Sequence, residues 1–449
     1  MATQTTCLGW LGILRVALVQ TALGAIVVLT TSTMNRVMVV ELALPAMLPG
    51  ALVALHHVVQ MLRPRLGHGS DVGGRRTPWI IGGMAVLALG GILAAVATAL
   101  MTTQVAAGVA LAVLAFVLIG IGVGAAGTSL LVLVAKSVLP QRRAPASTLM
   151  WTMMIAGFAV TAGTAGHFLD PYTPQRLVLV TSVVAVAAFL LALVAVWGIE
   201  SRVARPTLTA EPARTAVPFR VALQQVWQES QARAFTVFVF ISMLAYSAQD
   251  LILEPFAGTV FGMSPGQSTQ LAGLQNGATL LGMVLVAVAA GSQRGRARCS
   301  LRAWTVIGCC ASALALVAIA CSGQVGSASA LRLSVLALGL ANGVFAASAI
   351  ASMMELAHRG QARREGVRIG LWGAAQAIAY ALGGFLGAAG VDVARALLAD
   401  PAAGYLLVFV LEALLFLYAA THAARVGSAP AHSGPLLFDE SALDDAEPS

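Results

Sequence analysis

A few ionisable side chains of this sequence lie deep inside long apolar segments, where they are candidates for chemistry. Glu412 lies in the middle of its apolar run, where a charged carboxylate is costly unless it is protonated or paired. Glu412 could be a proton-linked carboxylate or a hydrogen-bond partner for a polar ligand. Alternatively, it could hydrogen bond a neighbouring helix. His56 and His57 could ligate a chelated metal axially or hydrogen bond a neighbouring helix. Because adjacent helical residues point about 100° apart, at most one of them should face a central cavity.

A carboxylate pair, Asp250 and Glu254, falls near the end of another apolar segment. The two residues are one helical turn apart and share a helix face. Pro255 is expected to end or kink the helix there. Three interpretations remain open for the pair: an extracytoplasmic gate, a contact with a partner, or solvated charge at a helix end.

Sequence motifs of several enzyme classes are absent. The sequence has no glycine-rich phosphate loop followed by Lys, no HExxH and no paired CxxC. Its Asp residues are scattered, whereas membrane prenyltransferases need clustered Asp pairs to hold magnesium and diphosphate. The sequence therefore predicts a protein that is not an enzyme and has neither a metal site nor a covalent cofactor.

The composition is that of a membrane protein. Hydrophobic residues make up 59% of the 449 positions and charged residues only 10%, with a mean hydropathy of +0.87. Soluble domains carry about a quarter charged residues, so this chain has too little polar surface to cover a water-soluble globule. The net charge of +8 does not indicate nucleic-acid binding, because the Arg residues lie in short loops beside apolar spans.

Apolar segments long enough to cross a lipid bilayer recur along the chain. A spanning helix needs about 20 apolar residues, and about twelve such segments predict an all-α polytopic membrane protein. The expected spans cover residues 14–34, 45–63, 79–99, 106–134, 147–169, 177–198, 234–253, 268–291, 303–321, 333–357, 367–390 and 403–423.

The distribution of basic residues predicts the topology. If the loops alternate between two sides, 22 of the 26 Lys and Arg residues fall on the side that also holds both termini. The positive-inside rule makes that side cytoplasmic. The longest polar stretch between spans, 199–233, is predicted to be a cytoplasmic linker between two six-helix halves, 1–198 and 234–424. The acidic segment 425–449 is predicted to be a disordered tail.

Two internal matches favour pseudo-symmetric halves. The first is an Arg-Arg pair that precedes a Trp by nine and eight residues, at the entrances to the fifth and eleventh spans: Arg142, Arg143 and Trp151, and Arg363, Arg364 and Trp372. The second, looser match lies in loops expected after the first and seventh spans: Asn35, Arg36 and Glu41, and Gln249, Asp250 and Glu254. The offsets of 221 and 214 residues are similar, as a duplicated architecture requires.

The loop between the second and third spans carries the pattern Gly-x-x-x-Asp-x-x-Gly-Arg-Arg, formed by Gly67, Asp71, Gly74, Arg75 and Arg76. This spacing resembles the cytoplasmic gating loop between the second and third helices of major facilitator superfamily transporters. Val72 departs from their pattern, because many of them carry a basic residue at that position.

Longer blocks resemble the bacteriochlorophyll delivery family, the PucC- and LhaA-type proteins of phototrophic bacteria. They include NRVMVVEL at 35–42, LHH at 55–57, GSD at 69–71, GRRTP at 74–78 and QDLILEPF at 249–256. The resemblance implies a major facilitator fold in the bacterial inner, photosynthetic membrane. It also implies a non-enzymatic carrier that handles bacteriochlorophyll or chlorophyll as cargo, with light-harvesting antenna polypeptides and pigment-synthesis enzymes as partners in antenna assembly.

Two other functions remain open. A proton-coupled secondary transporter of an unrelated small solute would use Glu412 or the pair Asp250 and Glu254. A membrane synthase subunit is the third interpretation. An oligomer is compatible with the stripes of small residues, which serve packing within and between chains alike.

Overall fold

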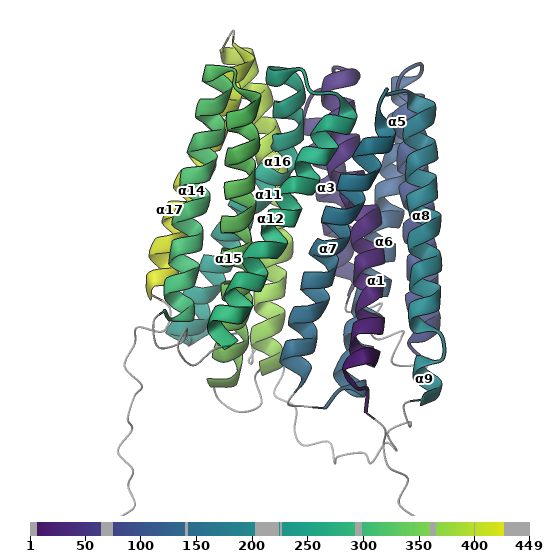
Figure 1. The fold of residues 1–449 in the computed structure, drawn as a ribbon, viewed down its shortest axis with the longest axis vertical. Helices are drawn as coiled ribbons and strands as arrows, with labels where there is room; N and C mark the ends of the chain where they lie inside the picture. Colours follow the sequence, from purple (N-terminus) through teal and green to yellow (C-terminus); the bar gives the residue numbers. More distant parts are fainter. Residues whose placement is uncertain are drawn as a thin grey trace, which may run out of the picture.

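The computed structural model describes residues 7–63, 75–139, 142–202, 224, 227–291, 299–359, 365–398 and 400–425. Almost all of these residues are helical (Figure 1). The first half of the molecule contains α1 (Trp10–Val28), α3 (Met47–Val59), α5 (Thr77–Leu100), α6 (Val105–Ser137), α7 (Arg143–Leu169), α8 (Pro174–Val196) and the short α9 (Ile199–Arg202). The second half contains α11 (Ser230–Phe261), α12 (Pro265–Gly291), α14 (Leu301–Val325), α15 (Ala328–Arg359), α16 (Glu365–Leu397) and α17 (Pro401–Arg425).

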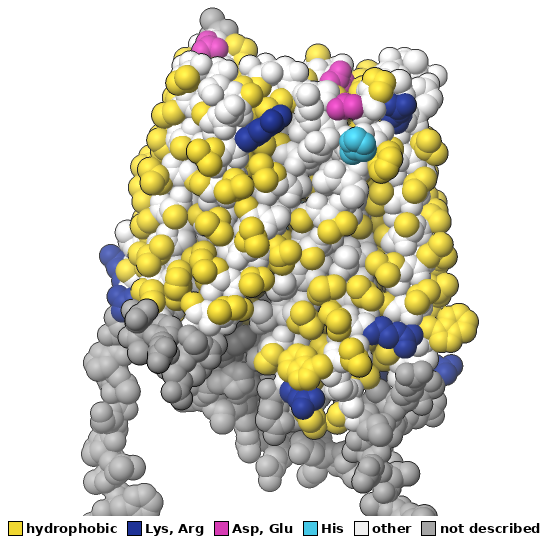
Figure 2. All heavy atoms as spheres, viewed as in Figure 1, with side chains coloured by type: hydrophobic (Ala, Val, Ile, Leu, Met, Phe, Trp, Pro, Cys, Tyr) yellow, Lys and Arg dark blue, Asp and Glu magenta, His cyan; other side chains and the backbone are white. Residues whose placement is uncertain are grey.

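The helices have the length and composition of membrane spans. Eleven helical segments of the described residues are long and apolar enough to cross a membrane, and the predicted second span is a shorter apolar helix, Met47–Leu62. Hydrophobic side chains cover most of the face shown in Figure 2, with charged side chains nearer its two ends. The predicted all-α polytopic membrane fold is confirmed.

Each half has its own buried core. The first-half core is largely aliphatic and includes the fully buried Ile13, Leu87 and Ile119. The second-half core is richer in aromatic rings, with Phe345 and Phe416 fully buried. Small residues let helices of one half approach closely, which replaces the hydrophobic driving force that water supplies to soluble proteins.

The two ends of the bundle differ in composition. The short-loop end, at the top of Figure 1, carries the connections 42–46, 101–104, 170–173, 262–264 and 326–327. The Arg-rich end, at the bottom of the same view, carries Arg63, Arg75, Arg76, Arg142, Arg143, Arg233 and Arg302.

The first span extends further than the sequence predicted. After α1, the helical path continues through the π-helical turn η1 (Leu29–Thr33), the short α2 (Met34–Arg36) and a second π-helical turn, η2 (Val37–Glu41). Asn35 and Arg36 therefore lie inside the span, and the prediction of a loop at these residues is wrong. The physical reason is that the second half supplies hydrogen-bond acceptors for both buried side chains.

The seventh span also passes its predicted end. α11 continues through Pro255 and ends before Gly262, whose φ of 63° is the left-handed conformation that glycine favours at a helix end. The predicted end at residue 253 is therefore wrong. Proline removes the backbone donor for the carbonyl four residues earlier, here Leu251, and that carbonyl finds its donor on another helix.

Several sequence predictions lie outside the described residues. These are the part of the linker at 203–223, the acidic tail from 426, the loop residues Gly67, Asp71 and Gly74, and the repeat residues Arg363 and Arg364. Within the predicted linker 199–233, α9 and the first residues of α11 are helical.

Candidate functional site

The two halves meet along a seam formed by α7 against α12 and by α3 against α16. Glycines make this approach close. A Cβ atom added to Gly166 would lie 2.7 Å from the backbone oxygen of Gly266, and one added to Gly50 would lie 2.9 Å from the Cβ of Ala388. Such crossings bring helix backbones nearly into contact, and they fix which polar groups meet across the seam.

Asn35 compensates for the donor that Pro255 lacks. Its side-chain amide donates a hydrogen bond to the backbone oxygen of Leu251 at 2.5 Å, and Asn35 is only 3% exposed. Buried backbone carbonyls are nearly always paired, and this one has no partner within its own helix. Asn35 therefore both completes α11 and ties the first half to the second.

Arg36 is a deeply buried charged group of the seam, at 2% exposure. Its guanidinium pairs with Glu41 at 2.5 Å and donates to the backbone oxygen of Met263 in the second half. The group lies against Gly258, where an added Cβ would be 2.9 Å from Nη2. Arg36 Nε has no hydrogen-bond partner among the described residues. The side chain is therefore held by both halves.

A buried carboxylate of α11 faces hydroxyl groups from both halves. Glu254 is 2% exposed and accepts hydrogen bonds from Ser32 of the first half and, at 3.4 Å, from Thr269 of α12. The hydroxyls of Thr33 and Thr269 lie 3.0 Å apart. The interpretation of Glu254 as solvated charge at a helix end is therefore wrong, because α11 continues past it and the first half covers it.

Two further carboxylates cross the seam, and the sequence did not indicate either of them. Asp170 accepts hydrogen bonds from the Ser264 hydroxyl at 2.7 Å and from the Gly266 backbone N–H at 3.3 Å. Asp392 accepts from the backbone N–H groups of Ala46 and Met47 at 2.9 and 2.8 Å, and so caps the start of α3. Their partners lie 94 and 346 residues away, so no local pattern reveals them.

These polar contacts gather at the short-loop end and close the seam there. Tyr172 lies in the connection between α7 and α8 at the same end. Burial and, to a smaller extent, the nearby Glu41 carboxylate raise the pKa of the Tyr172 phenol to about 12, while the Arg36 guanidinium acts in the opposite direction. The Tyr172 phenol thus lies in the electrostatic field of the Arg36–Glu41 pair.

A second part of the seam combines imidazole, phenol and carboxyl groups. The ring of His57 lies 5.2 Å from that of Tyr380 on α16, and Tyr380 lies 6.1 Å from Tyr246 on α11. Asp250 follows Tyr246 by one helical turn and shares its face. All four side chains remain partly exposed.

The two histidines differ in their surroundings. His56 is 2% exposed, its Nδ1 lies 3.0 Å from the backbone oxygen of Val53, and its backbone oxygen packs against Gly120 within the first half. His57 instead contacts the second half. In the part of the chain that the structure describes, no group of three or more His, Cys, Asp or Glu side chains is placed to hold a metal ion. His57 is therefore the histidine that faces the seam, whereas His56 is enclosed within the first half.

The remaining candidates do not join the seam contacts. Glu412 and Gln249 are buried at 2% and 0% exposure, and no described residue hydrogen bonds either side chain. The two repeat tryptophans differ in environment: Trp372 is 1% exposed and packs on Phe235 at 4.8 Å, whereas Trp151 is only partly buried.

The arginines at the Arg-rich end have local roles. Arg142 stacks over the ring of Trp10 at 5.7 Å, and Arg143 donates to the backbone oxygen of Val138 at 3.4 Å. Arg75 is exposed. The backbone N–H groups of Arg76 and Thr77 are capped by Glu200, at 2.5 and 3.1 Å. Glu200 thus anchors the start of α5, a role that the sequence did not indicate.

The arrangement of the helices is similar to that of a solved membrane transporter. A crystal structure of nucleoside transporter NupG is similar with a TM-score of 0.63 and 13% sequence identity, covering 94% of this chain and 99% of that one. A mutant of the same transporter gives a TM-score of 0.66. At this low identity the likeness shows the fold alone, which is that of a multi-pass helical membrane protein with the major facilitator fold.

Comparison of the amino-acid sequence with known proteins shows the family to which the chain belongs. A sequence model of the family described as PUCC protein matches residues 33–430. The chain therefore belongs to the PUCC protein family. It is 53% identical over 423 residues to the bacteriochlorophyll synthase 44.5 kDa chain of Rhodobacter capsulatus, covering 94% of this chain and 96% of that one. It is 31% identical over 427 residues to protein PucC of Cereibacter sphaeroides, covering 90% of each. The resemblance noted in the sequence is confirmed.

Proposed function

We propose that the protein is a non-enzymatic membrane carrier that handles bacteriochlorophyll or chlorophyll and supports assembly of light-harvesting antenna complexes. The observation that carries the proposal is the 53% identity, over nearly the whole of both chains, to a protein whose name refers to bacteriochlorophyll. The homologous PucC proteins and the family resemblance of the NRVM and QDLILEPF blocks point the same way.

His57 is the residue proposed to contact the pigment. Its imidazole lies at the seam, contacts Tyr380 of the other half and forms no hydrogen bond with any described residue. A neutral imidazole ligates a chelated magnesium through a free ring nitrogen. The neighbouring rings of Tyr380 and Tyr246 offer flat apolar surface to a planar macrocycle.

The proposed location is the bacterial photosynthetic inner membrane, with both termini cytoplasmic. The concentration of arginines at the Arg-rich end supports this orientation, because basic residues are retained on the cytoplasmic side. Antenna polypeptides and pigment-synthesis enzymes are the proposed partners. Cysteine labelling from each side of sealed vesicles tests the orientation.

The absence of catalysis is also part of the proposal, although one relative carries a synthase name. Outside its acidic C-terminal segment, the sequence has no clustered Asp pair that could hold magnesium and diphosphate. Synthase activity in the purified chain would contradict the proposal.

A second candidate function is proton-coupled transport of an unrelated small solute. The observation that favours it is the placement of Asp250 and Glu254 on one helix at the seam, where a change in protonation would act on contacts between the halves. Uptake into vesicles that an uncoupler abolishes, and that Glu254→Gln removes, would support this alternative.

The decisive experiment for pigment handling is purification of the tagged protein in mild detergent from a chlorophyll-making phototroph, followed by absorption spectroscopy and solvent extraction. Near-stoichiometric pigment that depends on His57 supports the proposal. A colourless protein that still retains antenna polypeptides would support a role in antenna assembly but not in pigment handling. A colourless protein without partners would favour solute transport.

A further inference from the structure

The core of the second half contains a layer of buried polar side chains that the seam does not use. Gln249, Ser312 and Asn342 are fully buried, and Glu412 is 2% exposed. They come from four different helices, α11, α14, α15 and α17 in that order. Polar groups at this depth in an otherwise aromatic and aliphatic core need partners or a ligand.

Ring contacts place Asn342 and Glu412 at the same level. Phe345 of α15 lies 6.0 Å from Phe416 of α17, and these two helices run in the same direction. Asn342 precedes Phe345 by one helical turn, and Glu412 precedes Phe416 by one turn. Ser312 of α14 joins them, because its hydroxyl donates to Asn342 Oδ1 at 2.9 Å.

Gln249 reaches the same level from α11. The ring of Phe256 lies 5.1 Å from Phe409 and 5.3 Å from Tyr405, which sets the register of α11 against the antiparallel α17. Gln249 lies two turns from Phe256 on the same face. This brings it to within about one turn of the level of Glu412.

The hydrogen-bonding capacity of this layer is not filled by protein. Both carboxyl oxygens of Glu412, both amide atoms of Gln249 and Nδ2 of Asn342 lack a partner among the described residues. A charged carboxylate without a partner is strongly disfavoured in such a core. A proton on Glu412 removes the charge and supplies a donor for an amide oxygen, either directly or through a water molecule.

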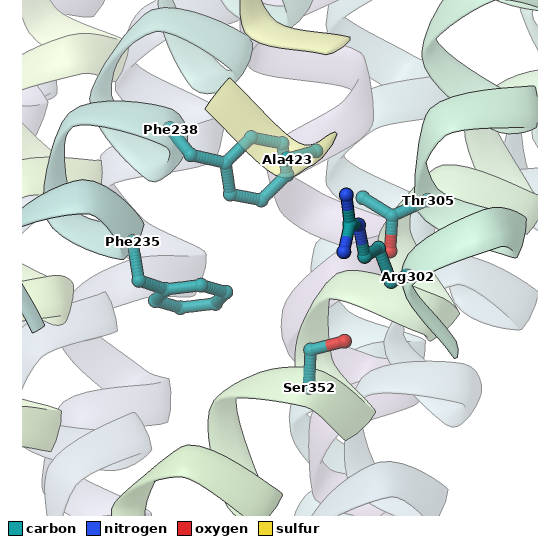
Figure 3. Close-up of a pocket in the computed structure, with 6 residues that line it drawn as sticks. All are labelled: Phe235, Phe238, Arg302, Thr305, Ser352 and Ala423. Atoms are coloured by element: carbon teal, nitrogen blue, oxygen red, sulfur yellow. The ribbon is translucent and has the colours of Figure 1, made fainter. Parts of the chain in front are cut away.

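A pocket at the Arg-rich end lies over the same four helices. It is a small pocket, partly open to solvent, and its lining is Phe235, Phe238, Arg302, Thr305, Ser352 and Ala423. Figure 3 shows the Arg302 side chain between Thr305 and Ser352, with the two phenylalanine rings on the other side of the pocket. From Ala423 to Glu412 the distance along α17 is roughly 16 Å.

Aromatic rings separate the pocket from the polar layer. Phe238, at the pocket, lies 6.0 Å from Phe345, which in turn contacts Phe416. We propose that Gln249, Ser312, Asn342 and Glu412 form a proton-binding site inside the second half, filled from this pocket when the Phe238, Phe345 and Phe416 rings move apart. The site is distinct from the seam and does not depend on the proposed pigment handling.

Among the described residues, the ionisable groups nearest to Glu412 along these helices have partners or positions of their own. Cys309 lies one turn from Ser312 on α14, Asp250 follows Gln249 on α11 and shares a face with Tyr246, and Asp392 and Arg395 lie at the short-loop end of α16. Tyr405, two turns from Glu412 on α17, lies beneath the Arg395 guanidinium at 5.2 Å. None of the described residues forms an ion pair with Glu412, so a proton is the proposed neutralising ligand.

Infrared spectroscopy of the purified protein during exchange from H₂O into D₂O tests the site. Glu412→Gln should remove one neutral-carboxyl band, while Glu254→Gln should leave that band in place. Gln249→Leu should shift the frequency of the band without abolishing it, and it keeps the test available if Glu412→Gln fails to fold.

The route is tested by the rate at which the same band exchanges. Phe345→Ala should speed the exchange by roughly tenfold or more, because it removes the central ring. Phe409→Ala, on the side of Glu412 away from the pocket, is the matched control and should leave the rate unchanged. A spectrum that Glu412→Gln does not alter, or a band that sodium ions abolish at constant pH, would overturn the proposal.

Discussion

The side-chain amide of Asn35 donates to the backbone oxygen of Leu251, which is the carbonyl that Pro255 leaves without a donor in α11. The two residues are 216 positions apart and belong to different halves. A helix of the second half is thus completed by a side chain of the first, which makes the integrity of α11 depend on closure of the seam.

This dependence predicts a coupling between Asn35 and Pro255. Asn35→Ala should destabilise the native protein by about 1–3 kcal/mol, because a buried carbonyl loses its partner. In a Pro255→Ala background the restored backbone N–H can serve Leu251, so the same substitution should cost clearly less. Thermal unfolding of the four proteins in detergent gives the coupling energy, and strictly additive effects would show that the two residues act independently.

The buried guanidinium of Arg36 predicts that loss of Glu41 alone destabilises the protein more than loss of both charges. Glu41→Ala leaves a charge buried at 2% exposure without its counter-ion and should cost about 2 kcal/mol, less than the roughly 3–5 kcal/mol of fully buried pairs because Glu41 is 34% exposed. The double variant Arg36→Met with Glu41→Ala should be more stable than Glu41→Ala alone. Melting temperatures at matched detergent concentration provide the measurement. A double variant less stable than either single variant would contradict the expectation.

Close packing at the seam predicts a sharp contrast between two glycines of α7. In Gly166→Ala the new methyl group would lie 2.7 Å from the Gly266 backbone oxygen and 2.9 Å from the Gln270 backbone nitrogen, so the halves must separate at a cost of about 1–3 kcal/mol. Gly163→Ala, one turn earlier, meets no atom within 4 Å and should be neutral or slightly stabilising. Unfolding midpoints compare the two, and equal losses would argue against backbone contact at the seam.

The positions of the spans were predictable because each apolar run is long enough to identify a helix without knowledge of its neighbours. The limits of the first and seventh spans were not. Asn35 and Arg36 resemble loop residues, and Pro255 resembles a helix end, until acceptors and donors more than 200 positions away are taken into account. Hydropathy contains no information about such partners.

The candidate site was predictable residue by residue but not as an arrangement. Glu254 and Arg36 were named as candidates near the ends of apolar spans, yet only the fold shows that Ser32 and Met263 are their partners. Asp170 and Asp392 were missed because a carboxylate that caps backbone N–H groups in the other half has an ordinary local sequence.

The environment of Tyr172 predicts a pH dependence at the short-loop end. Its pKa is raised from 10.0 to about 12, chiefly by burial. A raised pKa means that the stabilising contribution is complete below pH 10 and is lost as the pH rises through 12. Tyr172→Phe should therefore lose less stability than the native protein between pH 10 and 12. Glu41→Gln should lower the pKa of Tyr172, because it removes a carboxylate that opposes ionisation. Unfolding midpoints between pH 10 and 12 measure the stability of Tyr172→Phe, and absorbance titration of the tyrosinate measures the pKa of Tyr172. A titration step that is unchanged in Tyr172→Phe would show that another tyrosine titrates in this range.

The different directions of the two histidines predict different effects on pigment retention. His57 faces Tyr380 across the seam, and its ring nitrogens form no hydrogen bond with a described residue. His56 instead lies against the backbone of its own half. His57→Ala should lower the pigment retained after purification by at least about tenfold, equivalent to roughly 1.4 kcal/mol of binding free energy. His56→Ala should retain pigment and instead lose some stability, because it leaves a cavity in the first-half packing. Tyr380→Leu should shift the absorption maximum of the bound pigment, since the ring next to the ligand changes. Extracted pigment per mole of protein, together with the absorption maximum, separates these outcomes, and equal retention by both histidine variants would exclude axial ligation by His57.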